Sequence, residues 1–216
     1  MGRARGPEDA VEESPLPAQI GARLRRLRTA SGRSLASVAQ QLGISSSALS
    51  QIETGTMRPS VNRLVELVAV LGAPVSAIFD DLDLFAPDLD HAAGDVAEPV
   101  PGVLVTGPGE AAPAQLDQGV VYRRLSPAPL PGVDFFESIY PPGSASSADG
   151  AMLVHDGLES GYVRSGELTF EFTEGAVRLG AGGSLSFAAS RPHRVVNQTA
   201  EVASAIWLTI LPARGA

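Results

Sequence analysis

Apolar residues between positions 16 and 80 recur at the three- and four-residue spacing of α-helices, and a glycine follows each of the longer runs. These glycines are Gly32, Gly43, Gly55 and Gly72. Ser34, Ser45 and Ser60 stand directly before three of the runs, where a serine side chain can cap free backbone N–H groups. The pattern predicts a bundle of five helices over residues 16–80, of which the last is a short helix over residues 74–79.

The rest of the chain follows a β pattern, in which short runs of β-branched and aromatic residues alternate with glycine and proline turns. The runs are GVLVT, GVVYRRL, VDFFESIY, AMLVH, SGYVRS, ELTFEF, AVRL, SLSFAA, HRVVN and VASAIWLTI. About ten short strands at this spacing are typical of an antiparallel barrel or sandwich. The chain is therefore expected to be a multidomain α + β protein, with a β domain over residues 102–216.

Two segments fit neither pattern. Residues 1–15 are charged and contain prolines without an apolar run, which predicts a disordered arm. Residues 81–101 are acidic with scattered prolines, which predicts an acidic linker between the two domains.

Charge divides the chain in the same place. The net charge of the whole chain is -8, but residues 16–79 hold seven Arg and only two acidic residues. Residues 80–216 hold seven Arg and eighteen acidic residues. Because phosphate binding depends on local positive charge, the helical domain is suited to DNA and the acidic domain to another partner.

Composition also excludes several classes of protein. The chain has no cysteine, which excludes disulfides and thiolate metal sites. No apolar run approaches the roughly 18 residues of a membrane-spanning helix, and the N-terminus lacks a signal peptide. We expect a soluble, cytoplasmic protein with no membrane partner.

The segment SLASVAQQLGISSSALSQIETG has the geometry of a helix-turn-helix, whose second helix enters the major groove of DNA. Ala39 allows two helices to approach closely, Gly43 provides the tight turn, and Leu49 fills the space beneath it. The segment resembles the phage-repressor-like, or xenobiotic-response-element, helix-turn-helix family over about residues 16–80. The alternative is a generic helical bundle with serine caps and a solvated arginine face.

The resemblance implies which residues face DNA. Gln51 lies on the exposed face of the recognition helix and is the best candidate for base reading, because an amide can bond to adenine through two hydrogen bonds. Ser46, Ser47 and Ser50 share that face. The expected phosphate contacts are Ser34, Ser45 and Arg58, with Arg25, Arg26, Arg28 and Arg33 as further candidates. Glu53 is expected to pair within the domain and not to contact DNA.

Two motifs of the second domain resemble the cupin family of jelly-roll β-barrels. In LVHDGLESGYVRSGELTFEF, His155, Glu159 and Gly166 match the family pattern, while Leu153 stands at the position of the first histidine. The second motif is GGSLSFAASRPHRVVN, in which the matching residues are Gly182, Pro192, His193 and Asn197. The resemblance implies an antiparallel jelly-roll β-barrel from roughly residue 135 to residue 211.

The cupin resemblance implies a site for one divalent metal ion. His155, Glu159 and His193 would converge inside the barrel, and two imidazoles with one carboxylate form a ligand set for iron, zinc or manganese. The third histidine, His91, lies in the linker. Because Leu153 removes a fourth ligand, the alternative is a metal-free barrel in which the two histidines form hydrogen bonds beside an organic ligand.

Three functions agree with these features. The first is a bacterial transcription regulator that binds double-stranded DNA as a homodimer and senses a small-molecule effector in its cupin domain. The second is a metal-dependent cupin enzyme of the dioxygenase type that carries a DNA-binding head. The third is a DNA-binding protein whose barrel serves only for dimerisation. The lack of an evident acid–base residue favours a regulator over an enzyme.

Overall fold

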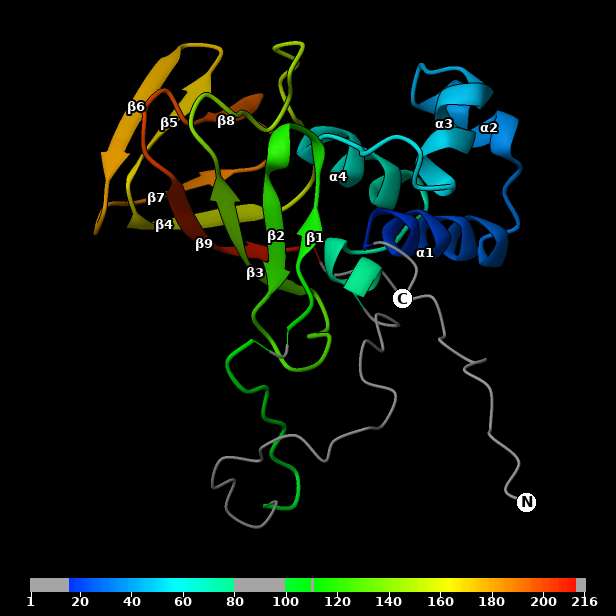
Figure 1. The fold of residues 1–216 in the computed structure, drawn as a ribbon, viewed down its shortest axis with the longest axis horizontal. Coiled ribbons are helices and arrows are strands. Elements are labelled where there is room, and N and C mark those ends of the chain that lie inside the picture. Colours follow the sequence, from blue (N-terminus) through cyan, green and yellow to red (C-terminus); the bar gives the residue numbers. More distant parts are fainter. Residues whose placement is uncertain (1–15, 80–99, 110, 213–216) are drawn as a thin grey trace, which may run out of the picture.

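The computed structural model describes residues 16–79, 100–109 and 111–212, with the helices first and the strands after them (Figure 1). The predicted arm over residues 1–15 and most of the predicted linker over 81–101 lie outside these ranges. Within the described parts of the chain, none of the helices has the length and apolar character needed to cross a membrane.

The helical region contains four α-helices whose ends follow the predicted caps. They are α1 (Leu16–Ala30), α2 (Leu35–Gln41), α3 (Ser46–Glu53) and α4 (Val61–Val70). The hydroxyl oxygens of Ser34, Ser45 and Ser60 accept hydrogen bonds from backbone N–H groups three residues later, at 3.1, 3.0 and 3.2 Å. These bonds satisfy donors that have no partner in the first turn of a helix.

The fifth predicted helix is a 3-10 helix, η1 (Val75–Phe79), so the bundle has four α-helices and not five. The segment follows Pro74 and contains only five residues, too few for a stable α-helix. All five residues are buried, so packing and not intrinsic helix preference holds the segment in place.

A buried ion pair joins the first helix to the third. Nε of Arg28 lies 2.6 Å from Oε1 of Glu53, and Nη2 lies 2.9 Å from Oε2. The Arg28 side chain is 12% exposed and the Glu53 side chain 5%. The predicted structural role of Glu53 agrees with this geometry, and the same bond engages Arg28, which the sequence offered as a DNA contact.

The strands form two antiparallel sheets. The larger sheet has the order β1-β2-β3-β9-β4-β7 and the smaller the order β6-β5-β8. The strands are β1 (Ala114–Gln115), β2 (Val121–Arg124), β3 (Val133–Tyr140), β4 (Leu158–Ser165), β5 (Glu167–Phe172), β6 (Gly175–Gly180), β7 (Ser184–Ala188), β8 (His193–Val196) and β9 (Ala203–Ile210), with a short 3-10 helix, η2 (Asp117–Gly119), after β1.

The predicted jelly-roll barrel is open, because no strand pairing joins the two sheets among the described residues. A glycine forms the corner between the two sheets. Only Gly166 separates β4 from β5, and its backbone has a φ of 69°. A Cβ at this position would lie 2.7 Å from the carbonyl oxygen of Val202, so only glycine allows the chain to turn from one sheet into the other here.

Two of the predicted strands are absent. The run GVLVT, residues 102–106, has no strand pairing, and Val103, Leu104 and Val105 are exposed. The run AMLVH, residues 151–155, makes a single bridge between Leu153 and His193. Both runs have the side chains of a strand but lack a partner strand along their length, which local sequence does not encode.

Hydrogen bonds dock the helices directly on the sheets. The carboxylate of Asp134 on β3 accepts the backbone N–H groups of Val75 and Ser76 in η1, at 2.9 and 3.0 Å. The backbone N–H of Asn62 on α4 donates to the carbonyl oxygen of Ser146 at 3.1 Å. These contacts fix α4 and η1 against the β region.

We predict that Glu53→Ala lowers the free energy of unfolding by about 3 kcal/mol, because it leaves the buried Arg28 guanidinium without its counter-charge. Urea denaturation followed by far-ultraviolet circular dichroism measures the change. The matched control is Glu66→Ala, which breaks the half-exposed Arg63–Glu66 pair and is expected to cost less than about 1 kcal/mol. Equal losses in the two variants would contradict the structural role of Glu53.

Candidate functional site

The structure exposes the seven main residues that the sequence assigned to DNA, and of the further arginine candidates Arg25 and Arg26 are exposed while Arg28 and Arg33 are partly buried. Gln51 and the serines at 46, 47 and 50 lie on α3, and all four are exposed. Arg58 follows α3 in an exposed turn, and Ser34 and Ser45 are exposed N-caps of α2 and α3. The hydroxyl oxygens of these caps already accept a backbone hydrogen bond, so only their O–H groups remain to donate to a phosphate.

A tight glycine turn sets the angle between α2 and α3. Gly43 has a φ of 64°, and Ala39 beneath it is 1% exposed. On the opposite side, a Cβ on Gly21 of α1 would lie 2.3 Å from the carbonyl oxygen of Ile52, so α1 packs directly against the end of α3. Small residues thus hold α3 closely on two sides.

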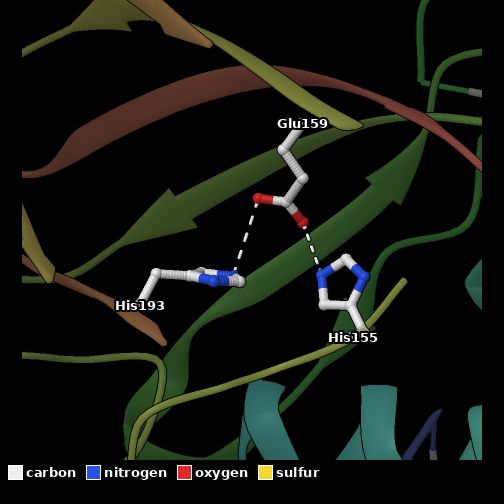
Figure 2. A group of neighbouring side chains, drawn as sticks. All are labelled: His155, Glu159 and His193. Atoms are coloured by element: carbon white, nitrogen blue, oxygen red, sulfur yellow. Dashed lines mark hydrogen bonds and ion pairs between the residues drawn. The ribbon is translucent and has the colours of Figure 1, made fainter. Parts of the chain in front are cut away.

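The second candidate site lies in the β region, where His155, Glu159 and His193 converge (Figure 2). Glu159 points inward from β4, His193 begins β8, and His155 stands in the loop before β4. Nε2 of His155 lies 2.8 Å from Oε1 of Glu159, and Nε2 of His193 lies 3.7 Å from Oε2. One donor atom from each residue lies within 4.8 Å of the others.

Backbone carbonyls orient both imidazoles. Nδ1 of His155 lies 2.9 Å from the carbonyl oxygen of Asp156, and Nδ1 of His193 lies 2.8 Å from that of Arg191. Because a carbonyl only accepts hydrogen bonds, Nδ1 is the donor in both of these bonds, and Nε2 of each ring faces the Glu159 carboxylate. This second layer of hydrogen bonds is the arrangement found around histidine ligands of metals.

The two histidines differ electrostatically. Burial alone disfavours the charged form of His155, but the hydrogen bond and the charge of Glu159, with the Asp156 carbonyl, outweigh it and raise the pKa of His155. Burial is the main cause that lowers the pKa of His193, although the Glu159 charge opposes it. Glu159 thus lies between two imidazoles of different basicity: the pKa of His155 is raised and the pKa of His193 is lowered.

The donor set fits a divalent metal ion. Nε2 of each imidazole and the Glu159 carboxylate provide three donor atoms, and all three side chains are at most 11% exposed. Leu153 contributes no donor, but its backbone N–H and carbonyl exchange hydrogen bonds with His193 at 2.7 and 3.0 Å. The leucine therefore keeps the bridge that positions His193 while making one edge of the site apolar.

The three residues line a cavity of about 260 Å³ that helix α4 also lines. From the β region the cavity receives apolar and aromatic side chains, among them Phe136, Leu153 and Trp207. From α4 it receives Val61, Asn62, Val65, Val68 and Ala69. In Figure 2 teal helical ribbon, the colour of α4 in Figure 1, lies below the three side chains.

Sequence reasoning missed the helical side of this cavity. The available signal was an apolar α4 with two faces: Leu64 and Leu67 are buried in the core, while other apolar residues face the cavity. A helix that serves one core usually shows one apolar stripe. Asn62, 3% exposed on this second face, was the polar exception that marked it.

Two family matches divide the chain in the same way. The helix-turn-helix domain family matches residues 19–78, and the cupin domain family matches residues 136–209. Over 74 residues the chain is 32% identical to uncharacterized HTH-type transcriptional regulators from Sinorhizobium medicae and Rhizobium meliloti. That stretch is 34% of this chain and about half, 53%, of each relative.

A solved structure has a similar fold. A transcriptional regulator of a helix-turn-helix family from Vibrio cholerae superposes with a TM-score of 0.64 and 24% identity. The comparison covers 91% of this chain and 97% of that one, so the two share their fold along nearly the whole length. The chain thus carries a region that matches the helix-turn-helix domain family, followed by one that matches the cupin domain family, in the order predicted from the sequence.

Proposed function

We propose that the protein is a cytoplasmic, sequence-specific DNA-binding transcription regulator whose cupin domain binds a small-molecule effector together with one divalent metal ion. The observation that carries this proposal is the His155–Glu159–His193 cluster, which lies in a cavity that is also lined by the helical head, residues 16–79. The head presents an exposed recognition helix, and its local charge is positive although the chain is acidic. One half of the molecule is thus suited to phosphate and the other to a small ligand.

For DNA, Gln51 is the proposed base-reading residue, supported by Ser46, Ser47 and Ser50 on the same exposed helix face. Arg58 and the N-caps Ser34 and Ser45 are the proposed phosphate contacts. Since one head makes few base contacts, two heads on neighbouring half-sites are needed for specific binding.

For the metal, His155, Glu159 and His193 are the proposed ligands. A bound zinc, iron or manganese ion would supply positive charge and open coordination positions for an effector atom. The protein's own groups favour binding over catalysis. The Asp134 carboxylate is engaged by two backbone N–H groups, and burial raises the pKa of Tyr122 and Tyr140, so these hydroxyls stay protonated at neutral pH.

A second copy of the chain is the proposed dimer partner, on the outer face of the larger sheet. Side chains along β4 and β9 point alternately to the two faces of the sheet, so every second one points outward. The pairing register of these two strands places Leu158 beside Ile210. The large apolar residues exposed on this face are Leu158, Tyr162, Leu208 and Ile210. An apolar sheet face of this kind is suited to a two-fold contact between identical subunits.

Gln51→Ala and Arg58→Ala are expected to weaken DNA binding in different ways. The first removes base reading and costs about 1–3 kcal/mol of discrimination at one base pair, while the second weakens binding to all sequences and lowers the salt slope by about one. Fluorescence anisotropy against duplexes selected by the wild-type protein, at several salt concentrations, measures both. Gln198→Ala, exposed on the cupin domain, is the control. Unchanged binding in both variants would remove α3 as the recognition helix.

The wild-type protein is expected to bind close to one equivalent of metal, and the His155→Ala/His193→Ala double variant to lose it, because one carboxylate alone is a weak ligand. Elemental analysis after incubation with zinc, iron or manganese salts and removal of free metal measures the content. His91→Ala, which changes the third histidine, is the matched control and is expected to keep the metal. A wild-type protein that stays empty with all three salts would exclude the metal site.

Tyr162→Glu is expected to convert the dimer to monomers at micromolar concentration, because it places a charge in the apolar contact. Sedimentation equilibrium measures the mass. Val177→Glu is the matched control, since Val177 is 44% exposed on the smaller sheet and Tyr162 is 46% exposed on the larger. If both variants stay dimeric, the contact lies elsewhere.

A further inference from the structure

The cavity beside the three candidate ligands belongs to two parts of the chain that lie far apart in sequence. Three valines of α4, at positions 61, 65 and 68, form an apolar wall opposite Leu153 and Trp207 of the β region. Since the two sheets do not close into a barrel, the helix covers the space between them. Any molecule that fills this cavity touches the DNA-binding head directly.

Asn62 is the polar group of this helical wall, and it has an unused acceptor. Its Nδ2 donates a 2.7 Å hydrogen bond to the carbonyl oxygen of Ala151, which fixes the orientation of the amide. Its Oδ1 is buried and has no hydrogen-bond partner. A buried acceptor without a partner is costly, so this oxygen is suited to an N–H or O–H donor of a ligand.

Other groups define the rest of the ligand. A metal held by two neutral imidazoles and one carboxylate keeps a net positive charge, which favours an anionic oxygen at that end. The Tyr140 hydroxyl also faces the cavity without a regular hydrogen-bond partner, although the Tyr122 hydroxyl is near enough to interact with it. Valine, leucine and aromatic side chains between these polar points favour a hydrocarbon body.

We propose that the ligand is a small carboxylic acid with an apolar body and a hydrogen-bond donor, and that it binds between the three candidate metal ligands and α4, with Asn62 as a ligand-contact residue. This inference rests on the proposed metal site. The carboxylate lies at the His155–Glu159–His193 end, and the donor bonds to Oδ1 of Asn62. The helical head then forms one wall of the ligand-binding site, in addition to responding to the bound ligand.

The same helix connects the ligand to the recognition unit. Arg63, next to Asn62, donates a 3.0 Å hydrogen bond from Nη1 to the carbonyl oxygen of Leu42, directly before the Gly43 turn. A shift of α4 on ligand binding would therefore move the turn between α2 and α3. Because binding free energies are reciprocal, ligand that favours one position of α4 changes DNA affinity, and DNA changes ligand affinity by the same factor.

The test uses the full-length, zinc-loaded protein and the fluorescence of Trp207, the chain's single tryptophan, which lines the cavity. The probes are hexanoate, ω-hydroxyhexanoate and hexanol. We expect both acids to bind at least about tenfold more tightly than hexanol, and the hydroxy acid more tightly than hexanoate, because its O–H reaches Asn62. Saturating ω-hydroxyhexanoate is expected to change DNA affinity by about fivefold or more.

Two variants separate the helical wall from the rest of the site. Asn62→Leu removes the acceptor and is expected to abolish the preference for the hydroxy acid over hexanoate, a ratio that general destabilisation does not change. Val65→Phe fills the cavity from the head and is expected to weaken both acids about tenfold. Glu66→Gln on the same helix is outside the cavity lining and is expected to leave both affinities unchanged.

Each result has one meaning. If both α4 variants bind the acids as the wild type does, the head is not a wall of the site and the inference is wrong, while the proposed function stands. If the zinc-loaded wild type binds neither acid, the ligand class is wrong. Metal content and DNA affinity, measured on the same preparation, then decide separately whether the proposed function holds.

Discussion

A buried carboxylate fixes how the two halves of this protein meet. Asp134 is 2% exposed, and its two oxygens accept the first backbone N–H groups of η1. A buried carboxylate is tolerated only where hydrogen bonds replace its hydration, and free N–H groups at the start of a helix provide them. With η1 held on β3 and the Asn62 backbone bonded to Ser146, α4 lies across the space between the sheets, so the cavity and its Asn62 wall depend on these contacts.

The same contacts explain why α4 is apolar on two sides. Leu64 and Leu67 complete the helical core, and Val61 and Val68 face the cavity. An isolated helical head would expose the second set to water, and an isolated cupin domain would leave its ligand site open. Each half therefore completes the other. This mutual dependence agrees with the proposed regulator, because a ligand in the cavity would act on a helix that belongs to the proposed DNA-binding region.

Local sequence patterns predicted the features that depend on few neighbours. Serine caps, the glycine turn before the recognition helix, and most strands follow from periodicity within a few residues, and the three candidate ligands followed from the cupin resemblance. The features that were missed join distant segments: Asp134 lies 59 residues from Val75, and Asn62 lies 89 residues from Ala151. The open barrel was missed for a related reason, because pairing between the two sheets depends on strands that lie far apart in the sequence.

In the proposed function, charge assigns DNA to the helical region and the ligand to the cavity beside the β region. Residues 80–216 carry more than twice as many acidic residues as arginines, so this part of the chain repels phosphate, which would confine the proposed DNA contact to the basic helical region. Repulsion of this kind falls off within about 10 Å at ordinary salt, so it orients the protein without changing the recognition helix itself. Any signal from the cavity must then pass through packed contacts. Within the described residues, α4 provides them: it faces the ligand site through Asn62 and holds the Leu42 carbonyl before the Gly43 turn through Arg63.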